Sequence, residues 1–504
     1  MEITISKRYL KSPVSYSGEV YHFKLSAGEG AEYSFDAAYA EKAADTVYYA
    51  DLREFLGQTV SMTIDPPVLL KQEYCDQSEP VKEDPMRPMA HFSAPRGWMN
   101  DPNGLCCYEG TYHLFYQHNP YGRTWGNMHW GHAVSKDLFH WEHCQEALLS
   151  DGDGVIFSGS ALIDYRNASG LKKGQNAPIL FYYTRVGKTH DQCLAVSTDG
   201  GLTLTKYERP VLPAMMSENR DPKVIFDQAR SRYLMALYVE ESRYALFVSE
   251  NLLDWRLLQE IELPGDNECP DIYPLRAEDG RKYWILSGAH DKYYVGIFDE
   301  EGYYSPVQEI GQLSYDSEGY AAQTYFYEKE KPVIRFTWDR SNIPGTPYNG
   351  SMCFPMEMGL VKRDGTFYLT ARPVSYEAGL VKKKTAFEQT GSLRVPLLRR
   401  AYEIEIHAGE AAYEINLFGL RLWGDQTGVR CKDKFLPRIG KDHTLRIISD
   451  TVSTELYLND VAVTSVAHLS DYAEGEFTVC SEGKLQKVCI MELGLYRCRK
   501  KNLP

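Results

Sequence analysis

Five short runs rich in aromatic and branched residues decide the fold: TYHLFYQ (111–117), PILFYYT (178–184), RYLMALY (232–238), KYWILSG (282–288) and KPVIRFTW (331–338). They recur at a spacing of about fifty residues. Each run is preceded by a further strand-like segment, and these segments are GWMNDPNGLCCY, FSGSALIDY, RDPKVIFD, CPDIYPL and YAAQTYFY. A blade of a propeller is a small sheet of sequential strands, so this modular spacing predicts a five-bladed β-propeller.

The segments on either side of the repeats also read as strands. EVYHFKLS and VSMTI alternate before a charged linker, KQEYCDQSEPVKEDPMRP, and AYEIEIHA, HTLRIIS, STELYLN and KVCIMELGLY follow the repeats. No long helical period is present anywhere. The sequence therefore predicts an all-β protein with a small N-terminal β-module (1–84), a five-bladed β-propeller catalytic domain (85–372) and a C-terminal β-sandwich (373–504).

Charge and cysteine usage limit the classes of partner. The formal net charge of −14 is the wrong sign for a protein that binds nucleic acid. No apolar run is long enough to span a membrane, and the N-terminus has no apolar signal core, so we expect a cytoplasmic location. The eleven cysteines are dispersed without a C-x-x-C pair, which favours free thiols in a reducing compartment over a zinc site.

Three acidic residues share one position within the repeats. Asp101, Asp221 and Glu268 lie in the first-strand segments of the first, third and fourth repeats. First strands line the central channel of a propeller, so we expect the three carboxylates to converge on one pocket and to raise at least one pKa there. Two carboxylates across a glycosidic bond are the minimal machinery of glycoside hydrolysis, and a third can hold the sugar ring.

Each of these residues also has a plainer interpretation. Asp101 lies in an Asp-Pro-Asn-Gly sequence and could cap a turn. Arg220 and Asp221 could form a structural ion pair, and Glu268 could be a solvated loop charge. Tryptophans in β-proteins are usually core residues. The shared register of the three acids favours a catalytic site over these alternatives.

Six ordered motifs resemble glycoside hydrolase family 32, which includes invertases, fructan β-fructosidases, levanases and inulinases. The motifs are HFSAPRGWMNDPNG (91–104), QHNP (117–120), WGNMHWGHAVSKDLFHW (125–141), FSGSA (157–161), RDPKV (220–224) and ECPD (268–271). The resemblance covers residues 88–360 and continues more faintly to DTVSTELYLND (450–460). It implies a five-bladed propeller with a β-sandwich, and hydrolysis of fructosides without a metal or organic cofactor.

The resemblance also assigns roles. It implies that Asp101 is the nucleophile, Asp221 the transition-state stabiliser and Glu268 the general acid/base of a reaction that retains configuration through a covalent fructosyl-enzyme. Arg220 is expected to keep Asp221 ionised. Retention predicts about 5–5.5 Å between the carboxyl groups of the nucleophile and the acid. The candidate substrate-binding residues are Trp98, Asn100, Gln117, Trp125, Phe157, Ser158, Arg220, Cys269, Tyr320 and Trp338.

Some questions stay open at this stage. Met356, in FPMEMGL (354–360), stands where the family commonly has arginine, so this region is expected to pack differently behind the pocket. The preferred fructoside, exo or endo action and a homo-oligomeric state are undecided. The alternatives to a hydrolase are a fructosyltransferase on the same scaffold and a non-catalytic carbohydrate-binding propeller.

Overall fold

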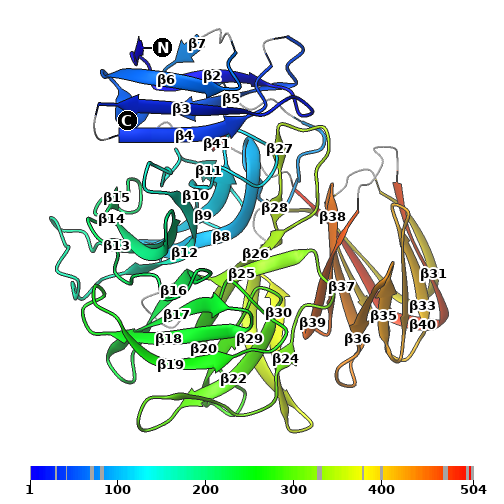
Figure 1. Ribbon diagram of the computed structural model, residues 1–504. Coiled ribbons are helices and arrows are strands. Elements are labelled where there is room, and N and C mark those ends of the chain that lie inside the picture. The colour runs from blue at the N-terminus through cyan, green and yellow to red at the C-terminus, as the bar shows by residue number, and fades with distance from the viewer. Residues whose placement is uncertain are drawn as a thin grey trace.

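The structure is a computed structural model that is almost entirely β (Figure 1). It describes residues 2–28, 31–40, 42–68, 73–79, 84–325, 332–376, 380–397, 401–468, 475–494 and 499–500. Within these ranges the helical part is one 3-10 turn, η1 (Arg53–Phe55), and no helix there is long and apolar enough to cross a membrane.

Two small sheets form the N-terminal module, which lies above the propeller in Figure 1. Their strand orders are β1-β6-β3-β4 and β5-β2-β7. Phe23 and Phe35, on neighbouring strands, stack at 4.8 Å between ring centroids inside the module. The strands are β1 (Glu2–Thr4), β2 (Tyr9–Val14), β3 (Tyr21–Ala27), β4 (Ala31–Ala37), β5 (Thr46–Asp51), β6 (Thr59–Asp65) and β7 (Glu73–Cys75).

Five successive antiparallel sheets follow. Their strands are β8 (Gly97–Tyr108), β9 (Thr111–Asn119), β10 (His129–Ser135) and β11 (Trp141–His143); β12 (Val155–Ile163), β13 (Ile179–Val186), β14 (His190–Ser197) and β15 (Thr205–Lys206); β16 (Arg220–Asp227), β17 (Arg232–Glu240), β18 (Arg243–Ser249) and β19 (Arg256–Glu262); β20 (Asp271–Arg276), β21 (Lys282–Ser287), β22 (Lys292–Phe298), β23 (Tyr304–Pro306) and β24 (Gly311–Gln312); and β25 (Gly319–Thr324), β26 (Val333–Asp339), β28 (Ser351–Met352), β29 (Met356–Arg363) and β30 (Thr366–Pro373). The recurring runs of the sequence are the second strands, which are almost fully buried because neighbouring sheets cover both of their faces.

The first strands of the five sheets form a closed ring. β8 contacts β12, β12 contacts β16, β16 contacts β20, β20 contacts β25, and β25 contacts β8 again. A short strand that lies between β26 and β28 in the chain, β27 (Tyr348–Asn349), pairs parallel to the start of β8 and so joins the last repeat to the first sheet. The first sheet also gains β41 (Arg499–Lys500) beside β11. The predicted all-β propeller is confirmed.

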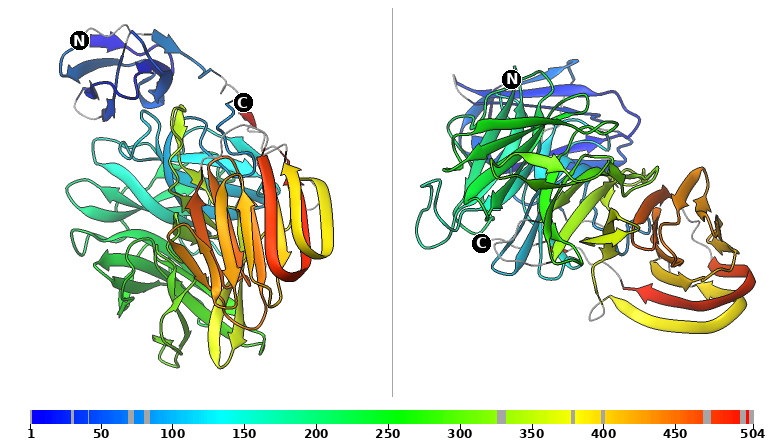
Figure 2. Two further views of the ribbon diagram at one scale, coloured as in Figure 1. Left: turned by 90° about the vertical axis from the view of Figure 1, so that its right-hand side faces the viewer. Right: turned by 90° about the horizontal axis from the view of Figure 1, so that it is seen from below.

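The C-terminal strands form one large sheet that folds over on itself (Figure 2). Its order is β36-β35-β34-β33-β40-β32-β37-β38-β39, and the two end strands also contact each other around a buried apolar core. This is the predicted C-terminal sandwich. The strands are β31 (Val381–Leu397), β32 (Tyr402–His407), β33 (Tyr413–Leu417), β34 (Leu420–Asp425), β35 (Gly428–Cys431), β36 (Lys434–Pro437), β37 (Thr444–Ser449), β38 (Ser453–Leu458), β39 (Ala462–Ala467) and β40 (Gly475–Leu493).

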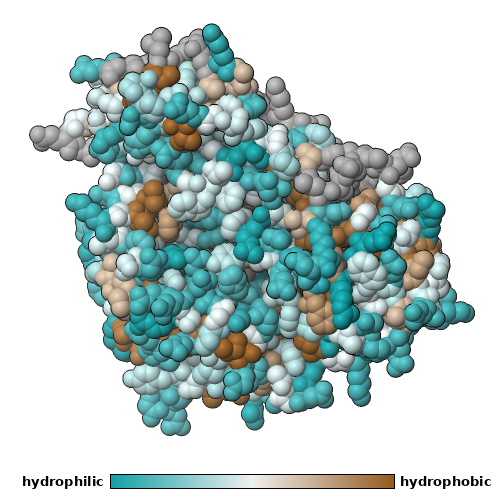
Figure 3. All heavy atoms as spheres, turned by 45° about the vertical axis from the view of Figure 1, so that its right-hand side comes forward, coloured by the Kyte–Doolittle hydropathy of each residue, from teal (hydrophilic) through white to brown (hydrophobic). Residues whose placement is uncertain are grey.

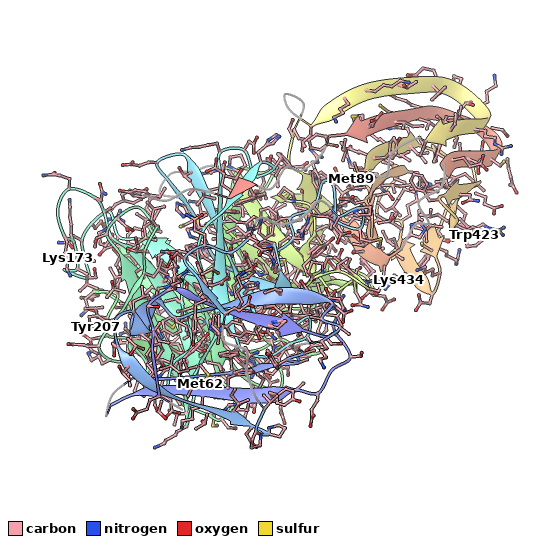
Figure 4. The ribbon with its side chains drawn as sticks, turned by 90° about the horizontal axis from the view of Figure 1, so that it is seen from above. Met62, Met89, Lys173, Tyr207, Trp423 and Lys434 are labelled. Atoms are coloured by element: carbon pink, nitrogen blue, oxygen red, sulfur yellow. The ribbon has the colours of Figure 1, made fainter. Side chains whose placement is uncertain are left out.

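A buried charged cluster joins this sandwich to the propeller. His91 contacts Asp450 at 2.8 Å through Nδ1 and Glu455 at 2.6 Å through Nε2. Burial alone lowers the pKa of His91, but hydrogen bonds and charges from the two carboxylates outweigh burial and raise it to about 10. Lys434, labelled on the sandwich in Figure 4, donates to the backbone oxygen of Asp316. The C-terminal motif DTVSTELYLND (450–460) therefore supplies both carboxylates of this contact between the sandwich and the propeller.

The departure at Met356 also has a structural account. The side chain is 2% exposed at the start of β29 and packs in the large core cluster of the propeller. Sandwich residues Tyr457 and Val463 belong to the same cluster. The predicted domain boundaries stay predictions; β30 ends at Pro373 and β31 begins at Val381.

Candidate active site

Irregular pairing interrupts the first strands where the candidate residues lie. Four of the five first strands break register with their neighbour, and in each of them one break spans or adjoins a candidate site residue. A β-bulge inserts unpaired residues and re-aims their side chains, as it does beside many active sites. The breaks lie between Met99 and Pro102, Ile156 and Gly159, Arg220 and Lys223, and Tyr320 and Gln323.

The backbone at two of the three acids is strained. Asp221 has φ 65°, Glu268 has φ 51° and Cys269 has φ 40°, all in the left-handed region. Each such residue costs about 1–3 kcal/mol, and strain of this kind concentrates at functional sites. Glu268 and Cys269 precede β20 rather than lie within it, so the fourth sheet presents its acid from the segment that leads into its first strand.

Asp101 is held by hydrogen bonds to both of its oxygens. Ser158 Oγ donates to Oδ2 at 2.6 Å, and Asn100 Nδ2 donates to Oδ1 at 3.2 Å. Trp98 Nε1 fixes the Asn100 amide by donating to its Oδ1 at 3.0 Å. Burial raises the pKa of Asp101, the Ser158 hydrogen bond opposes this, and the charge of Glu268 adds to it. Asp101 lies inside a strand, so the turn-capping interpretation is wrong.

Cys269 bridges two of the acids. Its Sγ lies 3.5 Å from Asp101 Oδ2 and 3.4 Å from Asp221 Oδ2, and its backbone N–H donates to Asp221 Oδ2 at 3.0 Å. Asp221 is 7% exposed. Burial raises the pKa of Asp221 to about 7. The positive charge of Arg220 opposes this rise, and the negative charges of Asp101 and Glu268 add to it. The expected convergence of carboxylates and the expected raised pKa are both present.

Glu268 is bound through both carboxylate oxygens. Arg220 Nη2 donates to Oε1 at 2.7 Å, and Tyr320 Oη donates to Oε2. The side chain is 31% exposed, so one face still reaches solvent. Glu268 is therefore not a free loop charge. Arg220 Nε lies farther from Asp221, 3.9 Å from Oδ2, and this contact does not keep the pKa of Asp221 low, contrary to expectation.

Aromatic rings and one amide surround the acids. Trp98 and Trp338 meet edge to face at 5.6 Å, and Tyr320 contacts Trp338 at 6.3 Å. Trp125 is 60% exposed and packs edge-on against Phe157 at 6.0 Å. Gln117 is 2% exposed, and within the described residues neither its amide nitrogen nor its amide oxygen has a hydrogen-bond partner. A buried amide without partners is costly, which suits a group that binds a ligand.

The sequence missed three neighbours of the site. Tyr244 Oη donates to the backbone oxygen of Glu268 at 3.2 Å, and Thr184 Oγ1 accepts from the backbone N–H of Asp221 at 2.9 Å. Glu218 accepts from Arg220 Nη1 at 2.9 Å. These residues lie in strand interiors or in an unremarkable loop, so no motif marks them. Over the described ranges, no group of three or more His, Cys, Asp or Glu side chains is placed to hold a metal ion.

Comparison with known proteins gives the family. Residues 91–371 match the model of the glycosyl hydrolases family 32 N-terminal domain. A levanase of Bacillus subtilis is 36% identical over 307 residues, which are 55% of this chain but only 45% of the levanase. An extracellular exo-inulinase of Aspergillus niger is 31% identical over 62% of this chain and 68% of its own length.

Solved structures share the fold. The exo-inulinase from Aspergillus awamori superposes with a TM-score of 0.75 and 24% identity, over 82% of this chain and 99% of that one. A fructofuranosidase from Schwanniomyces occidentalis complexed with fructosylnystose superposes with a TM-score of 0.73 and 23% identity, over 83% of this chain and 100% of that one. From its matched domain, which carries Asp101, Asp221 and Glu268, the chain belongs to glycosyl hydrolase family 32.

Proposed function

We propose that the protein is a retaining glycoside hydrolase that releases terminal β-D-fructose from sucrose, fructo-oligosaccharides or fructans of the levan or inulin type. The observation that carries the proposal is that Asp101 and Asp221, from two different sheets, both contact the thiol of Cys269, next in sequence to Glu268, whose carboxylate binds Arg220. Relatives named levanase, exo-inulinase and fructan β-fructosidase support the substrate class.

Asp101 suits the role of nucleophile. Its two oxygens are fixed by Ser158 and Asn100, so the carboxylate is held in one orientation before substrate arrives. It attacks the anomeric carbon of fructose and forms a covalent fructosyl-enzyme, while the glycosidic oxygen leaves on the opposite face. The separation of about 5–5.5 Å from the acid that retention requires stays a prediction.

Glu268 suits the role of general acid/base. Arg220 contacts two acids, Asp221 and Glu268. The side chain of Glu268 is 31% exposed, whereas that of Asp221 is 7% exposed. An acid/base must reach the leaving oxygen and then a water molecule, so partial exposure is needed. Glu268 donates its proton to the leaving oxygen and later deprotonates the water that releases fructose.

Asp221 suits the role of stabiliser. It is buried beside the nucleophile, with a pKa of about 7. Positive charge that develops on the fructosyl ring favours the ionised form of Asp221, so its hydrogen bonds to ring hydroxyls strengthen in the transition state. Gln117 offers an unpartnered amide for a further hydroxyl, and Trp98 with Trp338 provides an apolar wall. A cytoplasmic protein of this kind would act on short, imported fructosides.

Product analysis tests the proposal. Purified protein is incubated with sucrose, 1-kestose, inulin and levan, and products are separated by chromatography. We expect free fructose from at least one substrate, and a loss of several orders of magnitude in kcat for Asp101→Asn and Glu268→Gln, in variants that unfold like the wild type. Growing oligosaccharides at high sucrose would instead identify a transferase. Absence of fructose from all four substrates would overturn the proposal.

A further inference from the structure

A loop at the mouth of the site carries its most exposed aromatic ring. This loop, residues 120–128, joins β9 to β10 and is called the Trp125 loop below. Trp125 is 60% exposed, and among the described residues its ring meets that of Phe157 in a T-shaped contact at 6.0 Å. Phe157 adjoins Ser158, which binds Asp101. An indole that packs against one neighbouring ring and keeps most of its surface exposed, beside a sugar site, is suited to stack on a sugar ring.

Asn119 organises the Trp125 loop from within. Its Oδ1 accepts hydrogen bonds from the backbone N–H of Tyr121 and from Asn127 Nδ2, both at 3.0 Å. Its Nδ2 donates to the backbone oxygen of Thr124 at 2.9 Å. Asn119 therefore holds both ends of the loop and the residue next to Trp125.

The N-terminal module holds the same loop from outside. Asn127 Oδ1 accepts from the backbone N–H of Asp36 at 2.8 Å, and Asn127 Nδ2 donates to the backbone oxygen of Asp36 at 2.9 Å. Asp36 lies on β4, the strand of the module that faces the propeller in Figure 1. A side chain of the propeller thus pairs with the module in the manner of a strand.

Two aromatic contacts reinforce this attachment. The hydroxyls of Tyr33, on β4, and Tyr121, in the loop, are hydrogen-bonded to each other in a fully buried position, and Tyr33 Oη lies 3.2 Å from His129 Nε2. The guanidinium of Arg123, also in the loop, lies 4.8 Å from the ring centroid of Tyr16. Three loop residues are therefore anchored to the module, on both sides of Trp125.

We infer that the N-terminal module is a specificity element of the active site: it fixes the Trp125 loop and so sets an aromatic platform for the sugar on the leaving-group side. Trp98 and Trp338 contact each other beside Asn100, which binds Asp101, whereas Trp125 is largely exposed. The inference rests on the proposed function. The face of the molecule shown in Figure 3 is largely hydrophilic, with apolar residues scattered over it.

Binding of a trisaccharide tests the coupling. All variants are made in the Glu268→Gln background, and the Kd of 1-kestose is measured by calorimetry. Asn127→Gly removes the amide pairing at a residue whose φ of 44° glycine adopts without strain. The matched control is Asp36→Ala, which keeps the backbone groups that Asn127 binds and removes an exposed carboxylate that contacts His22 within the module. Asn127→Gly also removes the hydrogen bond from Asn127 to Asn119, so Tyr33→Phe, a change on the module side alone, is the second test variant and should weaken binding in the same direction.

Weaker binding that depends on Trp125 is the expected result. Asn127→Gly and Trp125→Ala should each raise the Kd about five- to tenfold, and the double variant should bind no more weakly than Trp125→Ala. Asp36→Ala should stay within about twofold of its parent. Wild-type affinity in both Asn127→Gly and Tyr33→Phe, or additive effects in the double variant, would overturn the inference. An enzyme that releases no fructose from any substrate would instead overturn the proposed function.

Discussion

The hydrogen bond from Ser158 to Asp101 makes a sharp prediction about pH dependence. At 2.6 Å, a hydroxyl that donates to a carboxylate is a strong, charge-assisted bond, worth about 1.5–3 kcal/mol to the ionised form. Ser158→Ala removes it and leaves burial and Glu268 to raise the pKa of Asp101 further. Since one pKa unit corresponds to about 1.4 kcal/mol, the pKa of the nucleophile should rise by about one to two units.

Asp101 and Asp221 both act in their ionised forms, so the acidic limb of the pH profile of kcat/KM reflects both groups, and a higher pKa of Asp101 should move this limb to higher pH. The assay is fructose release from sucrose over the full pH range, for the wild type and Ser158→Ala. Ser197→Ala is a matched control, because Ser197 also donates to an aspartate, Asp199 at 2.7 Å, at a turn of the second sheet. An acidic limb that stays in place in Ser158→Ala, or moves to lower pH, would refute the reasoning.

Two further substitutions test the framework around the site. In Gly159→Ala a Cβ would lie 1.9 Å from the backbone oxygen of Tyr182, so we expect the free energy of unfolding to fall by more than about 4 kcal/mol in denaturant unfolding. Gly391→Ala, where the nearest atom is 3.8 Å from the added Cβ, is the control and should be nearly neutral. His91→Ala leaves two carboxylates buried without their partner and should cost about 3–5 kcal/mol; a loss below about 1 kcal/mol would contradict this. Because folding raises the pKa of His91 from 6.5 to about 10, its contribution to stability is complete below pH 6.5 and is lost as the pH rises through about 10, which unfolding curves measured across that range would detect.

Much of the fold was predictable because its strands are short, buried and repeated. The five recurring runs are the second strands, and GWMNDPNGLCCY and RDPKVIFD match β8 and β16 over their whole length. Asp101 and Asp221 were predictable for the same reason, because both lie in first strands. Glu268 precedes its first strand, β20, so the repeat predicted its position only approximately. Asp-Pro-Asn-Gly is a common turn sequence, but here it is part of a strand because β8 pairs with β9.

Other features depend on contacts between segments distant in sequence. Arg220 lies closer to Glu268 than to Asp221, and this depends on where the fourth sheet begins. No local pattern predicts that starting point. The attachment of Asn127 to Asp36 spans two modules, and each residue alone is an ordinary surface residue. Sequence patterns predict which residues lie on a face, whereas the partner of each polar group is set by tertiary packing.

The central claim is that Asp101 attacks the anomeric carbon of fructose, while Glu268 supplies the proton and activates water. Azide rescue of Glu268→Ala tests this claim most directly. An aryl β-D-fructofuranoside, whose leaving group needs no proton, is supplied with sodium azide, and the fructosyl azide formed is analysed by NMR. Because azide attacks the fructosyl-enzyme from the face that water uses, we predict faster turnover and a product of β configuration. A product of α configuration, or no acceleration by azide, would contradict the assignment of this pair.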